Sequence, residues 1–137
     1  MIGYRFVPVQ FVLAQCNRWT AAIAINQDLK MPAPAAYLKI LHDNGISLES
    51  EGVKDMALAP AFALMAITAL EDARVGIIGG ESWQESRGRW VSTYQAWDVE
   101  ARGFSDPDEF LRQSWRDAKA NVEKYLQRTD IVFVLAI

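Results

Sequence analysis

The chain has 137 residues, a net charge of −3, 51% hydrophobic residues and 23% charged residues, which is the composition of one ordinary globular domain spanning 1–137. Because it has no excess of basic residues, duplex nucleic acid is not expected as a partner. One cysteine, Cys16, and one histidine, His42, exclude an internal disulfide and disfavour metal sites built from several such ligands, so no metal and no cofactor are expected.

In the N-terminal segment, residues 1–35, the hydrophobic residues follow no clear helical or strand period. Helix-like spacing of apolar residues competes there with β-branched and aromatic residues, so helix and hairpin both stay open. An apolar run at 6–14 followed by Cys16 is similar to a lipoprotein signal, but Gln15 stands where the cleavage site needs a small residue. The longest apolar stretch, 57–70, is too short to span a bilayer. We therefore prefer a buried structural segment and expect no membrane contact.

Two helices are expected in the first half of the chain, at 34–44 and 60–72. Each begins with a proline, which suits the first turn because no N–H is needed there. Asn44 and Gly45 are typical of a helix C-terminus, where both tolerate positive φ. The face of the second helix that we expect to be buried contains Phe62, Met65, Ala66, Ala69 and Leu70.

Two strands are expected next, at 74–79 and 89–99. The first is short and aliphatic, and Gly79 and Gly80 are expected to end it, because paired glycines permit a turn. Residues 86–88 (Ser-Arg-Gly) are typical of a tight turn. The alternation that follows predicts a strand antiparallel to the first.

A longer helix is expected at 107–128, where Asp106 can cap the N-terminus and Pro107 fits the first helical position. Its buried face is predicted by residues at steps of three or four: Leu111, Trp115, Ala118, Val122 and Tyr125. Seven consecutive apolar residues at 131–137 predict a strand that is buried on both faces. The sequence thus predicts an α+β fold, with a small, mainly antiparallel sheet packed with about three helices.

No catalytic set stands out. The stretch 79–82 (Gly-Gly-Glu-Ser) lacks the spacing of a nucleophile elbow or of a phosphate loop. Nearby carboxylates are by default solvated surface groups, since acid–base catalysis needs two of them held in a cleft. His42 lies near the C-terminal end of the first helix, where the negative end of the helix dipole favours a partly charged imidazole. A small enzyme or ligand-binding protein that uses a turn at 79–83 (Gly79 to Trp83) and nearby carboxylates is the alternative hypothesis.

Aromatic and acidic residues gather in one region of the chain. Trp83, Trp90, Tyr94 and Trp97 fall within fifteen residues, and 81–109 contains seven acids against three arginines. Stacking on nucleic acid needs interleaved basic residues, whereas an acidic surface with tryptophans suits a basic protein partner. At least half of the tryptophans are expected to fill the core. The candidate partner-binding residues are Glu81, Trp83, Glu85, Asp98 and Glu100.

An ordered series of short motifs runs from residue 52 to residue 137. Its parts are Gly52-Val53-Lys54-Asp55-Met56-Ala57-Leu58, Ile77-Ile78-Gly79-Gly80-Glu81, Trp97, Ser114 with Ala118 and Tyr125, and Phe133-Val134-Leu135. In order and spacing the series resembles the bacterial polymorphic-toxin immunity proteins of the immunity protein 40 family. Two positions depart from the family's pattern: Glu81 stands where Asp is usual, and Ala96 precedes Trp97 where Asn is expected.

The resemblance implies a small α+β protein that is made beside a secreted toxin and blocks it by stoichiometric binding, with no chemistry of its own. The implied partner is the cognate toxin protein. The single cysteine fits a reduced compartment, so a cytoplasmic location is expected. We expect a monomer or a weak homodimer. A subunit of a larger apparatus is a further alternative.

Overall fold

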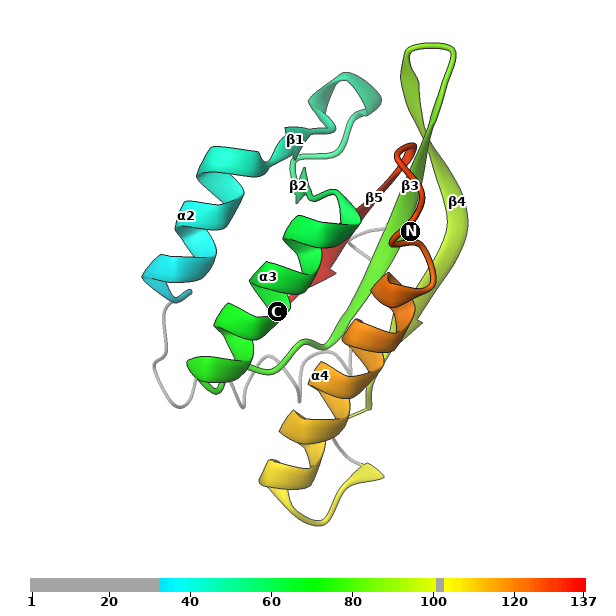
Figure 1. Ribbon diagram of the computed structural model, residues 1–137. Coiled ribbons are helices and arrows are strands. Elements are labelled where there is room, and N and C mark those ends of the chain that lie inside the picture. The colour runs from blue at the N-terminus through cyan, green and yellow to red at the C-terminus, as the bar shows by residue number, and fades with distance from the viewer. Residues whose placement is uncertain (1–32, 101–102) are drawn as a thin grey trace.

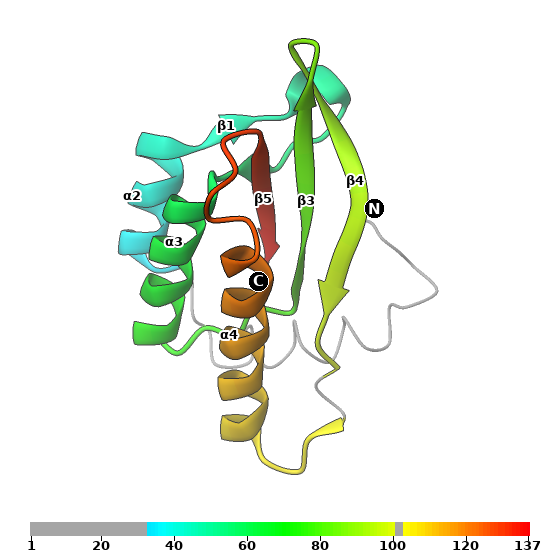
Figure 2. The ribbon, with the colours of Figure 1, turned by 45° about the vertical axis from the view of Figure 1, so that its right-hand side comes forward.

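The computed structural model describes residues 33–100 and 103–137. Three helices lie on one face of a three-stranded antiparallel sheet of order β4–β3–β5 (Figures 1 and 2). The helices are α2 (Ala35–Asn44), α3 (Pro60–Asp72) and α4 (Pro107–Glu123), and the strands are β3 (Gly79–Ser86), β4 (Arg89–Asp98) and β5 (Ile131–Ala136). The predicted α+β class is confirmed. Cys16 and nearly all of the segment 1–35 lie outside the described residues.

A short hairpin continues the sheet beyond β5. It consists of β1 (Ile46–Ser47), the 3-10 helix η1 (Glu49–Glu51) and β2 (Met56–Ala57). Leu58, directly after β2, exchanges two backbone hydrogen bonds of 2.8 Å with Phe133 of β5. β5 therefore has β3 on one side and the hairpin on the other.

The position of β5 explains its unbroken apolar sequence. Ile131 and Phe133 point toward the helices and join the main core, whereas Val132 and Val134 point to the opposite face. There they form a second cluster with Leu48 and Ala57, which we call the outer cluster. All four β5 residues are at most 7% exposed, so the prediction of a strand buried on both faces is confirmed.

The helix starts follow from their prolines and caps. α3 begins at Pro60 and ends at Asp72, as predicted. α4 begins at Pro107, and the Asp106 carboxylate accepts a 3.0 Å hydrogen bond from the backbone N–H of Asp108. That bond satisfies one of the N–H groups that a helix start leaves without a partner.

The predicted C-terminus of α4 is wrong by five residues, because the helix ends at Glu123 and not at Arg128. The backbone N–H groups of Tyr125 and Leu126 bond three residues back, which tightens the chain into turns. Arg128 then pairs with Asp130 at 2.8 Å instead of standing at the helix end. This pairing lowers the pKa of Asp130 to about 2.

The predicted buried face of α3 is partly wrong. Ala66 and Leu70 are fully buried, but Met65 is 51% exposed and the stripe is completed by Ala63 and Ile67. α3 lies between α2 and α4 and is apolar almost all round (Figure 1). The sequence period alone therefore could not select the inward stripe.

The end of α2 uses Gly45 for a reason other than the predicted one. Its φ is −69°, so no left-handed conformation is involved. A Cβ at this position would instead clash with the Leu41 carbonyl oxygen, to which the Gly45 N–H donates. Close approach of the chain, and not positive φ, requires the glycine.

The predicted strand at 74–79 is wrong. Val75 to Ile78 form an irregular segment, and β3 begins at Gly79, where the strand was expected to end. Two α4 side chains hold the segment: the Ser114 hydroxyl accepts from Ile77 N–H at 3.1 Å, and the Trp115 indole donates to the Val75 carbonyl at 2.8 Å. The Val75 carbonyl and the Ile77 N–H are therefore not available to a sheet, and the backbone bonds to β5 begin only at Ile78, whose N–H donates to the Ala136 carbonyl.

Gly79 and Gly80 lie within β3, so they do not form a turn. The Trp97 ring of β4 lies against Gly80, where a Cβ would come within 2.6 Å of Trp97 Cζ2. At Gly79 a Cβ would collide with the Trp97 carbonyl oxygen. Both glycines therefore serve close packing between two strands.

The burial of Tyr37 on α2 predicts an alkaline loss of stability. Desolvation, and secondly the charge of Asp55, raise its pKa to about 12 from 10.0. Between pH 10 and 12 the unfolded chain loses this proton while the folded chain keeps it, so stability falls as pH rises, by at most about 1.4 kcal/mol per pH unit. Urea unfolding at pH 8 and pH 11 should show a smaller loss for Tyr37→Phe than for the parent. Tyr94→Phe, at an 88% exposed site, should leave the loss in place. Equal losses in the parent and Tyr37→Phe would contradict this assignment.

Candidate partner-binding surface

Three of the predicted binding residues share the face of β3 that is turned away from the helices, which we call the outer face. Glu81 pairs with Val134 of β5, and Trp83 pairs with Val132. Directly paired residues of neighbouring strands point to the same face. Because side chains alternate along a strand, Glu85 joins Glu81 and Trp83 on this face.

Asp98 belongs to the same face, whereas Glu100 does not lie on a strand. Asp98 pairs with Gly79, two residues before Glu81, so it points to the outer face as well. Glu100 follows the end of β4 by two residues and is partly buried. The fold thus brings four of the five predicted residues together on one surface.

Tryptophans and carboxylates alternate on the outer face. Trp83 and Trp90 are partly buried and pack against the outer cluster. Glu85 lies directly across from Trp90 and is exposed, as is Asp98. The face therefore presents acidic groups around a partly covered aromatic centre.

The remaining strand tryptophan serves the main core. Trp97 points toward the helices and meets Phe133 edge-on, with 6.3 Å between the ring centroids. Trp115 of α4 is also buried, at 5% exposure. The tryptophans of the described residues thus divide between the two faces of the sheet.

The β3–β4 turn is formed as predicted from 86–88. Arg87 and Gly88 have φ values of 53° and 78°, the left-handed pair that a two-residue hairpin needs. Beside it Arg89 pairs with Glu51 of η1 at 2.8 Å, which lowers the pKa of the Glu51 carboxyl. The pair joins the base of this turn to the β1–β2 hairpin.

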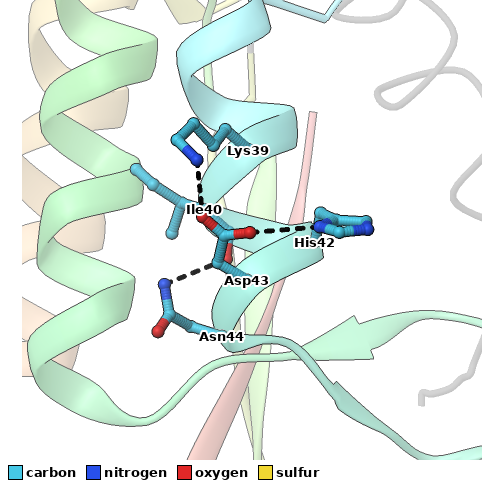
Figure 3. Close-up of polar contacts among 5 residues, drawn as sticks. All are labelled: Lys39, Ile40, His42, Asp43 and Asn44. Atoms are coloured by element: carbon cyan, nitrogen blue, oxygen red, sulfur yellow. Dashed lines mark hydrogen bonds and ion pairs between the residues drawn. The ribbon is translucent and has the colours of Figure 1, made fainter.

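Among the residues that the structure describes, the polar partner of His42 is its neighbour Asp43. It lies in the last turn of α2, as expected, with its ring 89% exposed and Nδ1 3.1 Å from Asp43 (Figure 3). Lys39 donates to the other oxygen of the same carboxylate at 2.8 Å, and this bond is the main cause that lowers the pKa of Asp43. The group is a solvated charge cluster on the helix surface.

The turn required by the alternative enzyme hypothesis is not formed, since 79–83 are strand residues. Ser82 is buried, and its hydroxyl lies 2.6 Å from that of Thr93. A hollow between α2 and α3 contains one carboxylate, Asp72, and one beside α4 contains Glu71. Within 33–100 and 103–137, no group of three His, Cys, Asp or Glu side chains is placed to hold a metal, and no helix has the length and apolar character to cross a membrane.

A bulge in β4 carries a residue that the sequence did not single out as a site. Between the pairs Glu81–Ala96 and Trp83–Ser92, β3 contributes one residue and β4 contributes three. Tyr94, in the middle of the three, has φ of 61° and is 88% exposed. For a bulky side chain this left-handed conformation costs about 1–2 kcal/mol.

Side chains hold the bulge in place. The Ser92 hydroxyl accepts from Tyr94 N–H at 3.0 Å, and the Thr93 hydroxyl accepts from Gln95 N–H at 3.1 Å. From α4 the Tyr125 hydroxyl donates to Gln95 Oε1 at 3.1 Å. Local hydroxyls thus replace the ladder bonds that the extra residues cannot make.

A model of the immunity protein 40 family matches residues 47–137, which is more than half of the chain. The chain belongs to the immunity protein 40 family. Comparisons with curated proteins and with solved structures gave no match. In this member of the family several of the resembling motifs have structural roles: Gly80 lies under Trp97, and Ser114 and Ala118 are fully buried in the face of α4 that meets the core.

Proposed function

We propose that this protein neutralises a cognate bacterial toxin by stoichiometric binding in the cytoplasm, and that it turns over no substrate. The observation that carries the proposal is its membership of the immunity protein 40 family. The contact surface of this proposal is the outer face, because Glu81, Trp83, Glu85 and Asp98 share it. Glu100, just beyond β4, extends the acidic character of this region.

The charge of the outer face favours a basic partner surface. Residues 81–109 contain seven acids and three arginines, a net charge of −4. Such a surface attracts a basic protein at long range and raises the association rate. Trp83, at the centre of the face, fits the aromatic anchors that dominate stable interfaces. An inhibitor interface of this kind buries roughly 1,200–2,000 Å² in total.

Mixing the purified protein with the product of the adjacent toxin gene tests the proposal. We expect a 1:1 complex by gel filtration with mass measurement, and survival of cells that express both proteins. The expected basic toxin surface should also make association slower as salt is added. Absence of both a complex and protection would reject the proposed function.

Glu85→Lys tests the role of the outer face. The exposed Glu85 carboxylate lies beside Trp90, and its reversal places a positive charge against the basic partner. At low salt we expect association with the toxin to slow roughly tenfold, with a smaller effect at high salt. The measurement is the association rate by surface plasmon resonance at two salt concentrations.

Asp72→Lys is the matched control. Asp72 ends α3 on the helix side of the sheet, is exposed, and its replacement changes the net charge by the same amount. Association should stay within about twofold of the parent at either salt concentration, since only the location of the charge differs. Equal slowing by both variants would show that net charge, and not the outer face, governs the encounter.

A further inference from the structure

Tyr94 is the most exposed large hydrophobic residue of the described chain, at 88%, and its backbone is held in a left-handed conformation. A glycine or an asparagine would adopt this backbone with less strain. The exposed ring adds nothing to the main core or to the outer cluster. Folding therefore gives no reason for an aromatic residue at this position, whereas strained residues and bulges gather at functional sites.

The surroundings of Tyr94 are those of a contact site. Tyr94 borders a hollow of about 400 Å³ between the bulge and the end of α4, together with Gln95, Lys124 and Tyr125. The hydrogen bond between Tyr125 and Gln95 fixes one wall of this hollow. Two further apolar side chains are exposed close by in sequence: Val91 on β4, at 48%, and Leu126 directly after Tyr125, at 42%.

We propose that the Tyr94 bulge is an anchor for the toxin, on the edge of the sheet where β4 is the last strand of the described sheet. This inference rests on the proposed function. The ring fits an apolar pocket on the toxin, and the phenol and Lys124 fit hydrogen-bond acceptors at the rim of that pocket. Because β4 borders both faces, one toxin surface reaches the bulge and the acidic outer face together.

The strain at Tyr94 gives a test that separates binding from folding. Tyr94→Gly removes the ring and relaxes the backbone. We expect its thermal midpoint to rise by about 2–4 °C, while its Kd for the toxin rises about 30-fold or more, mainly through faster dissociation. Tyr94→Phe keeps the ring and should stay within about threefold of the parent in Kd. A structural role for Tyr94 would instead lower the midpoint.

Arg87→Gly is the matched control, because Arg87 is exposed and has a φ of 53°, yet carries no aromatic ring. It should raise the midpoint in the same way and leave Kd within about threefold of the parent. The results distinguish the two proposals. If the parent protein does not bind the toxin, the proposed function is rejected. If the parent binds the toxin only as tightly as Tyr94→Gly does, the proposal that Tyr94 is an anchor is rejected. Equal weakening by Tyr94→Gly and Arg87→Gly also overturns it.

Discussion

Replacing Trp115 with alanine should lower the free energy of unfolding by about 3–5 kcal/mol. The Trp115 side chain is 5% exposed on the inward face of α4, so its removal leaves a large cavity. It also removes the 2.8 Å hydrogen bond to the Val75 carbonyl, which holds the segment that leads into β3. Urea unfolding followed by circular dichroism measures the loss.

One variant separates the packing from the hydrogen bond, and a second serves as a control at an exposed site. Trp115→Phe keeps most of the packing and loses the hydrogen bond, and should cost about 1–3 kcal/mol. Leu126→Ala, at a 42% exposed site, should change stability by less than about 0.5 kcal/mol. If the free energy of unfolding of Trp115→Ala lies within about 1 kcal/mol of the parent value, α4 does not anchor the 75–78 segment.

Gly80→Ala should destabilise the fold by about 1–3 kcal/mol, because the new methyl group meets the Trp97 ring inside the sheet. If contact with the Trp97 ring is the cause, the effects of substitutions at Gly80 and Trp97 on the free energy of unfolding should be coupled. In a Trp97→Leu background the ring is gone, so Gly80→Ala should cost clearly less than it does in the parent. A double-mutant cycle measured by urea unfolding gives this coupling energy.

Two other glycines serve as controls for the cycle. Gly79→Ala meets a carbonyl oxygen of the main chain, so Trp97→Leu should not relieve its cost. Gly103→Ala meets nothing within 4 Å and should be neutral or slightly stabilising. If Gly80→Ala costs the same in both backgrounds, contact with the Trp97 ring is not the reason for the glycine.

The helices were predictable because their signals are local. Pro60, Asp106 and Pro107 act on the first turn that follows them, and the structure begins both helices there. The 74–79 strand was not predictable, since its apolar residues are buried whether they pair with a strand or with α4. Ser114 and Trp115, which decide between these outcomes, lie almost forty residues away along the chain.

The candidate surface was predictable in part. Alternation places Glu81, Trp83 and Glu85 on one face once β3 is known to include them, although the turn expected at Gly79–Gly80 concealed this. The Tyr94 bulge left no trace in the pattern. It adds two residues to β4, so Ser92 and Ala96 stay in phase on either side of it. Because side chains alternate along a strand with a period of two, an insertion of two residues leaves the sequence pattern unchanged.

β5 is the last strand in chain order, yet it lies between β3 and the β1–β2 hairpin and contributes to both hydrophobic clusters. Neither cluster can close until Ile131 to Ala136 have emerged from the ribosome. We therefore expect a chain whose synthesis stops ahead of Ile131 to leave both hydrophobic clusters open and to have no stable fold.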